Sequence, residues 1–195
     1  MRSAEFDREK VLSGAINAFI AKGYNKTSMQ DLKVATGLHP GSIYGAFKSK
    51  KGLMLAAIKQ YETDKNQTFK TFFAGKTRLT DGILEYLLDT VKDIRSTKPD
   101  VQKACLIQKA LTELNDNEPE IEAALRQSLS GWQGAFTDIF QQARENGEID
   151  DARTLEQRTQ SLVIGIFGLR TYAQIQTDID VLNQQAEQIF RDVCA

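Results

Sequence analysis

The chain has 195 residues, of which 41% are hydrophobic and 26% are charged, a composition typical of a folded globular protein. The segment from Met1 to Lys10 is polar and charged, and the longest apolar runs, such as 162–169, are too short to span a bilayer. We therefore expect no signal peptide and no membrane association, and a cytoplasmic location. Its two cysteines form no metal-ligand or redox motif, so no cofactor is expected.

Charge is divided unevenly along the chain. Residues 1–51 carry nine Lys and Arg against four Asp and Glu, a net charge of +5. The remaining residues carry 16 basic and 22 acidic side chains, a net charge of −6. A basic end on an otherwise acidic protein is typical of a surface that meets nucleic-acid phosphate, and a solvated charged face is the alternative.

Two helices are predicted at the start of the basic segment. An apolar stripe marks the first, which Gly23 and Tyr24 end, and its members are Val11, Leu12, Ala15, Ile16, Phe19 and Ile20. Ser28 stands where the N-cap of a second helix belongs, because its hydroxyl can accept a free backbone N–H of the first turn. Gly37 ends that helix, since glycine adopts the left-handed conformation without steric cost.

A third short helix follows a tight turn. Pro40 suits its first position, where the missing N–H is not needed, and Ile43 and Phe47 face inward four residues apart. The positions left outward are Gly41, Ser42, Tyr44 and Gly45. A short braced helix with a small outward face is the geometry that enters a DNA major groove.

This segment, about a quarter of the chain, resembles the N-terminal DNA-binding domain of the TetR family of transcriptional repressors. The matching residues are Thr27, Ser28, Asp31, Leu32, Gly37, Gly41, Ser42, Ile43, Tyr44, Phe47, Ser49, Lys50 and Leu53. His39 replaces the usual Ser or Thr cap, and Lys51 replaces the usual Glu. The resemblance implies an all-α fold. It places a helix-turn-helix domain over residues 1–51 and a helical effector-binding and dimerisation domain over 52–195.

The resemblance also implies which residues bind DNA. Tyr44 and Lys50 are expected to contact phosphates, and Thr27 and Ser28 lie at the start of the first motif helix. The set further includes His39, Gly41, Ser42, Gly45 and Lys48. Glycine has a physical use at such positions, because it lets the backbone approach bases and thymine methyl groups closely.

The rest of the chain predicts helix after helix, with no strand, repeat or low-complexity segment. The predicted ranges are 53–73, 79–94, 101–114, 121–146, 154–175 and 178–193. Gly75, Lys98-Pro99-Asp100, the cluster 115–119 and Gly147 separate them.

The last two predicted helices carry an unusually large apolar surface. Gly165 and Gly168 let another backbone approach, and Ile175, Leu182 and Ile189 belong to the matching stripe that follows. A helix that is apolar on most sides must be covered, either within the monomer or by a symmetric partner. TetR-like proteins are typically dimers through these helices, so the resemblance implies a homodimer.

Aromatic residues gather in the middle helices. Trp132 and Phe136 lie on one helical face and are flanked by Gly131 and Gly134. Core packing is one interpretation, and the resemblance implies the other, an effector cavity. The candidate pocket residues are Phe69, Tyr86, Gln108, Trp132, Phe136 and Phe167. No cluster of carboxylates or arginines identifies a ligand charge, so the class of the small-molecule effector stays open.

Cys105 lies near the start of a predicted helix with Lys103 close by, which favours a thiolate. A sensor of electrophiles or oxidants is one hypothesis for this residue, and an inert buried cysteine is the other.

The leading hypothesis is a ligand-responsive repressor that binds a near-palindromic double-stranded DNA operator as a homodimer and is released by a small molecule. An enzyme is disfavoured, because the chain has one histidine, no nucleophile paired with a base and no phosphate loop. A third hypothesis is a protein-binding helical domain, which salt-dependent binding of duplex DNA would distinguish.

Overall fold

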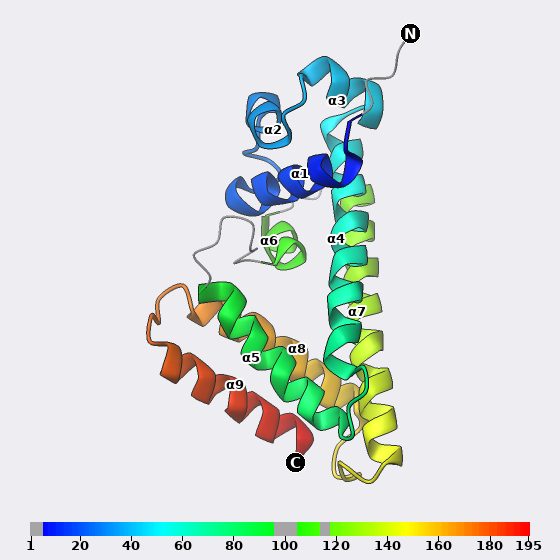
Figure 1. Cartoon of the computed structure of the whole chain (residues 1–195), viewed down its shortest axis with the longest axis vertical. Coiled ribbons are helices and arrows are strands. Elements are labelled where there is room, and N and C mark those ends of the chain that lie inside the picture. Colours follow the sequence, from blue (N-terminus) through cyan, green and yellow to red (C-terminus); the bar gives the residue numbers. More distant parts are fainter. Residues whose placement is uncertain (1–5, 96–104, 114–117) are drawn as a thin grey trace. The chain divides into compact units, whose positions relative to one another are not determined.

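The structure is a computed structural model that describes residues 6–95, 105–113 and 118–195. Within these ranges every regular element is an α-helix (Figure 1), which confirms the predicted all-α fold. The helices are α1 (Arg8–Lys22), α2 (Met29–Thr36), α3 (Pro40–Phe47), α4 (Lys50–Phe73), α5 (Leu79–Arg95), α6 (Leu106–Glu113), α7 (Pro119–Glu145), α8 (Leu155–Tyr172) and α9 (Ile179–Cys194).

The chain forms two compact units. The first contains residues 1–65 and 104–129, and the second contains residues 66–103 and 130–195. Helices α4 and α7 therefore contribute residues to both units. The domain boundary expected after residue 51 separates a DNA-binding segment from the rest of the chain, and it stays a prediction.

The first unit packs α1, α2, α3 and the beginning of α4 around one apolar core. Its fully buried members include Ala15, Ile16, Leu32, Ile43, Leu53, Met54 and Ala57. Close approach of α1 and α2 depends on Gly14, because a Cβ atom there would lie 2.2 Å from the carbonyl oxygen of Ala35. Apolar burial and this backbone contact together fix the short helices that precede α4.

The second unit has its own core, formed by α5, parts of α4 and α7, and both C-terminal helices. Fully buried members include Ile83, Leu87, Val91, Phe136, Phe140, Leu162, Leu182 and Ala186. The buried Arg158 guanidinium donates to the carbonyl oxygens of Val193 (2.7 Å), Ala195 (2.6 Å) and Asp150 (3.0 Å), and pairs with the Asp150 carboxylate. These bonds compensate a buried charge and hold the end of α9 against the segment before α8.

Glu148 caps the N-terminus of α5. Its carboxylate accepts from the backbone N–H groups of Leu79 (3.1 Å) and Thr80 (3.0 Å) and from the Thr80 hydroxyl (2.9 Å). Burial opposes ionisation of this carboxyl, but the hydrogen bonds outweigh burial and lower the pKa of Glu148. The connection between α7 and α8 is thereby fixed to the start of α5.

Several predicted helix boundaries differ from the structure by one to three residues, as at the start of α4, which is Lys50 and not Leu53. Helix α8 ends at Tyr172 and not at Ile175, because Gln174 and Ile175 donate to carbonyl oxygens only three residues back, those of Thr171 and Tyr172, in a tight turn. Helix α6 begins at Leu106 within the predicted range 101–114. Residues 101–104, Leu114 and the Lys98-Pro99-Asp100 break lie outside the described residues.

Candidate nucleic-acid interface and effector region

The start of α2 is fixed by a capping box. The Ser28 hydroxyl accepts from the Asp31 backbone N–H at 3.1 Å, and the Asp31 carboxylate accepts from the Ser28 backbone N–H at 2.9 Å. Lys22 of α1 donates to the same carboxylate at 2.6 Å. Lys22 and the Ser28 hydrogen bonds hold the pKa of Asp31 well below its usual range. The predicted N-cap is confirmed, and the Ser28 hydroxyl is engaged in it.

The turn into α3 sets the direction of that helix. Gly37 has φ +72° and ends α2 in the left-handed conformation, as predicted. Pro40 occupies the first turn of α3, and the side chain of His39 makes no capping hydrogen bond. Ile43 and Phe47 are buried in the core of the first unit. Since these two side chains anchor α3, its opposite face is directed to solvent.

The outward face of α3 includes two glycines, Gly41 and Gly45. Tyr44 is 48% exposed. The other exposed residues of this face are His39, Gly41, Ser42, Gly45 and Lys48. A Cβ atom at Gly41 or Gly45 would meet no atom within 4 Å. By contrast, a Cβ at Gly52 of α4 would lie 2.0 Å from the Phe47 carbonyl oxygen. Packing within the chain therefore accounts for Gly52 but not for the two α3 glycines.

The side chains of Thr27 and Lys50 are less exposed to solvent than those of the exposed α3 residues. Thr27 is 1% exposed, and both its N–H and its hydroxyl donate to the Gly23 carbonyl oxygen, at 3.1 and 2.6 Å. It holds the loop before α2 from beneath the surface. Lys50 Nζ lies 4.6 Å from the centroid of the Tyr24 ring and 3.4 Å from the Asn25 carbonyl oxygen. Burial lowers the pKa of Lys50, and the charge of Glu118 opposes this shift.

Two contacts made by acidic side chains at the start of α7 were not found from the sequence. The Tyr24 hydroxyl donates to Glu118 at 3.3 Å, and Lys51 Nζ lies 2.8 Å from Glu120 Oε1. Burial, followed by the charge and hydrogen bond of Glu118, raises the pKa of Tyr24 to about 12. These partners are some 70 to 95 residues apart along the chain, and no local pattern signals such pairs.

The predicted effector residues are divided between the two units. Phe69, Tyr86, Trp132, Phe136 and Phe167 meet in the second unit, whereas Gln108 belongs to the first. The Phe136 ring lies 5.0 Å from Phe69, 5.2 Å from Tyr86 and 5.5 Å from Trp132, centroid to centroid. Trp132 is half-buried and stacks on Phe167 at 6.1 Å. The rings of Phe69, Tyr86 and Phe167 thus surround the Trp132–Phe136 pair.

The glycines beside Trp132 do not create a cavity within this aromatic cluster. Gly131 and Gly134 are exposed, and a Cβ atom at Gly134 would meet nothing within 4 Å. The predicted link between these glycines and an internal cavity therefore has no support in the packing. Phe136, with no exposed surface, is a core residue.

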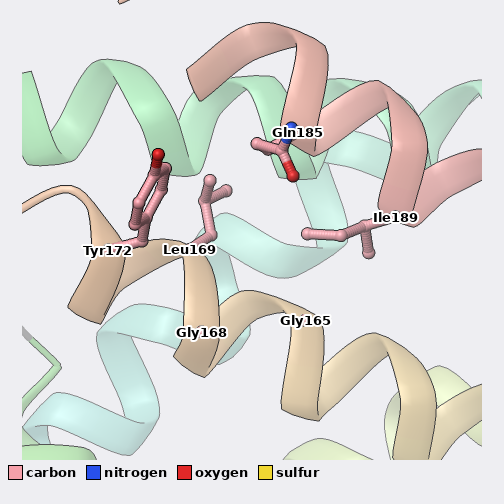
Figure 2. A pocket seen from close by; sticks show the side chains of 6 residues that line it. All are labelled: Gly165, Gly168, Leu169, Tyr172, Gln185 and Ile189. Carbon is pink, nitrogen blue, oxygen red and sulfur yellow. The ribbon is translucent and has the colours of Figure 1, made fainter. Parts of the chain in front are cut away.

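Helices α8 and α9 enclose a surface pocket of about 220 Å³. Figure 2 shows the side chains of Leu169 and Tyr172 on α8 and of Gln185 and Ile189 on α9 around it, with Gly165 and Gly168 along α8. The exposed apolar side chains of these helices and their connection are Ile164, Tyr172, Ile175 and Ile179. Leu182 has no exposed surface, so it belongs to the core and not to the outer face.

The two cysteines differ in surroundings. Cys105 is half-buried immediately before α6, and the Tyr61 hydroxyl lies 3.5 Å from its sulfur. Burial raises the pKa of Cys194 to about 12. Among the described residues, no three His, Cys, Asp or Glu side chains group as a metal site would require. No helix of the described chain is both long and apolar enough to cross a membrane.

The capped α2, the turn at Gly37 and the outward face of α3 define a helix-turn-helix regulator. The family model "Bacterial regulatory proteins, tetR family" matches residues 11–57, and the model "Tetracyclin repressor-like, C-terminal domain" matches residues 83–189. The second match covers more than half of the chain, and the protein belongs to the TetR family. It is a DNA-binding transcriptional regulator. The members of this family are regulators and not enzymes, which confirms the prediction against catalysis.

Similar proteins cover nearly the whole chain. The uncharacterized HTH-type transcriptional regulator YezE of Bacillus subtilis is 27% identical over 187 residues, 95% of each chain. The HTH-type transcriptional repressor ComR of Escherichia coli is 24% identical over 149 residues, 76% of this chain and 70% of ComR. A cysteine mutant of the TetR family regulator CifR, solved with 26-bp operator DNA, has a TM-score of 0.79 at 26% identity, covering 95% of this chain and 96% of CifR.

Proposed function

We propose that this protein is a repressor that binds a near-palindromic operator as a homodimer and is released by a small molecule. The outward face of α3 carries the proposal. A glycine inside a helix costs about 1 kcal/mol relative to alanine, and α3 has two within eight residues. Neither Gly41 nor Gly45 is needed by the packing of the chain. Their use is the close approach of an external surface, here the edges of bases in the major groove.

The surrounding side chains supply contacts to the DNA backbone and the bases. Tyr44, Lys48 and Lys50 contact phosphates, while His39 and Ser42 lie beside the glycines and face the base edges. Ser28 lies near the backbone at the start of α2, and Thr27 holds the preceding loop in place. Phosphate contacts fix the position of the protein on the duplex, and contacts to the base edges select the sequence. Operator DNA in the CifR structure and the repressor name of ComR support this assignment.

The homodimer forms through α8, α9 and their connection. Ile175 is 80% exposed, Ile164 is 70% exposed, and a pocket lies between the two helices. Several large exposed apolar side chains on neighbouring segments support an interaction site here, which a second copy would cover symmetrically. Ile175→Glu is expected to produce monomers in sedimentation at micromolar concentration. Gln127→Glu is the matched control, because it adds the same charge at an exposed residue of α7 outside this surface and is expected to leave the dimer intact.

The effector binds against the aromatic cluster at the half-buried Trp132. The rings of Tyr86, Phe136 and Phe167 adjoin the indole and offer an apolar or aromatic ligand a surface on which to stack. Trp132 is the only tryptophan, so quenching of its fluorescence reports binding at this place. A ligand that releases the protein from DNA without changing the indole emission would place the effector elsewhere.

Selection of bound duplexes from a random pool tests the function itself. The expected product is two similar half-sites whose centres are about one helical turn or a multiple of it apart. Tyr44→Phe and Lys50→Ala should then weaken binding to selected and unrelated duplexes alike, and Lys50→Ala should reduce the salt dependence by about one ion. Loss confined to one base position would contradict a phosphate role for these residues.

A further inference from the structure

Lys50 and Lys51 open α4, next to the proposed DNA-binding face, and both amines already have partners within the first unit. Lys51 pairs with Glu120 of α7. Lys50 lies over the Tyr24 ring, donates to the Asn25 carbonyl oxygen and experiences the charge of Glu118. Glu118 itself accepts the Tyr24 hydroxyl. Lys51 thus contacts a carboxylate in the first turn of α7, whereas Lys50 contacts Tyr24 and Asn25.

We infer that Glu120 takes the place of a DNA phosphate at Lys51, and that operator binding exchanges this internal contact for a phosphate contact. The inference rests on the proposed function and extends it in one respect. It adds Lys51 to the residues that bind phosphate and makes Glu120 its internal competitor.

The exposure of the Lys51–Glu120 pair permits such an exchange. The two side chains are 38% and 62% exposed, so water screens their attraction and little energy is lost when they separate. A lysine neutralised by a carboxylate also contributes little to counterion release when it meets DNA. The Glu120 carboxylate is therefore expected to lower the affinity for every duplex and to weaken its salt dependence.

Glu120→Gln tests the exchange and Glu122→Gln is its control. Glu122 lies two residues further along α7 and pairs at 2.7 Å with Arg126 of the same helix, so its loss changes the net charge equally but frees no lysine of α4. The probes are a fluorescent duplex selected from a random pool and an unrelated duplex, measured between about 50 and 200 mM salt. Glu120→Gln is expected to bind both about two- to five-fold more tightly, with a salt slope steeper by about one. Glu122→Gln is expected to gain less.

The same measurement in a Lys51→Ala background assigns the gain to the lysine. There Glu120→Gln should gain no more affinity than Glu122→Gln does, and the slope should steepen no more. Equal gains in Glu120→Gln and Glu122→Gln in the wild-type background, or a larger gain by Glu120→Gln that persists without Lys51, would overturn the inference. So would weaker DNA binding by Glu120→Gln at an unchanged melting temperature, because the carboxylate would then be positioning the lysine.

Failure of the proposed function is distinct from these outcomes, because the random pool would then yield no preferred sequence for the wild-type protein.

Discussion

Helices α3 and α8 each carry two glycines, and the surroundings of these glycines differ. A Cβ atom at Gly165 of α8 would lie 2.8 Å from Ile189, so packing against α9 within the same chain accounts for this glycine. Gly168, and both Gly41 and Gly45 of α3, face open space. A glycine with a neighbour inside the chain has an internal explanation. One that faces open space has no such explanation, and we propose that DNA approaches the α3 glycines and that a second copy approaches Gly168.

Substitutions in the aromatic cluster are expected to give the largest change in stability, and the change should differ between a buried and a half-buried ring. Phe136→Ala removes a wholly buried ring that packs on three other rings, and should cost about 3–5 kcal/mol of unfolding free energy. Trp132→Ala should cost clearly less, since the indole is only half-buried. Urea unfolding measures both. Equal losses would show that Trp132 is a core residue and would remove the basis for an effector surface there.

Glycines in contact with backbone provide the next contrast. Gly52→Ala would place a methyl group 2.0 Å from the Phe47 carbonyl oxygen and should destabilise the protein by about 1–3 kcal/mol. Gly168→Ala should leave the unfolding free energy of the monomer nearly unchanged or raised, because nothing lies within 4 Å. A larger Gly168→Leu side chain should weaken the dimer in sedimentation equilibrium. An undisturbed dimer would argue that α8 meets its partner elsewhere.

The N-termini of α5 and α3 also differ in whether a side chain of the protein caps them. The start of α5 is capped by Glu148, whereas His39 provides no side-chain cap for α3. Glu148→Gln should cost about 1 kcal/mol at neutral pH. Because the pKa of Glu148 is lowered in the folded protein, its contribution is present above the ordinary value of 4.5 and is lost as pH falls through the folded value. Wild type and variant should therefore converge in stability on acidification, and a constant difference down to pH about 2 would contradict the carboxylate cap.

The features predicted correctly from the sequence depend on residues that are close together along the chain. The Ser28 cap, the Gly37 turn and the inward pair Ile43 and Phe47 depend on residues no more than a few positions apart, and the structure has all of them as predicted. The effector region was less predictable. The five aromatic residues meet, but Gln108 belongs to the other unit.

Most structural features that could not be predicted from the sequence depend on contacts between residues that are far apart along the chain. Glu120 reaches Lys51 across 69 positions and Glu148 reaches Leu79 across the same number, and neither pair has a periodic signature. Leu182 matched an apolar stripe, yet periodicity cannot tell a core face from an interface, and the residue is fully buried. The early end of α8 at Tyr172 likewise follows from a turn with no proline or glycine to mark it.

The smallest expected change in stability tests the central claim most directly. Gly45→Ala removes a helix-weakening glycine at a position with no neighbour, so the free protein should become about 0.5–1 kcal/mol more stable. If the α3 backbone lies against the bases, the added methyl group occupies that interface. Affinity for the selected duplex should then fall about ten-fold, a loss of about 1.4 kcal/mol, with little change on an unrelated duplex. A more stable Gly45→Ala protein that binds the selected duplex as tightly as wild type would contradict the account.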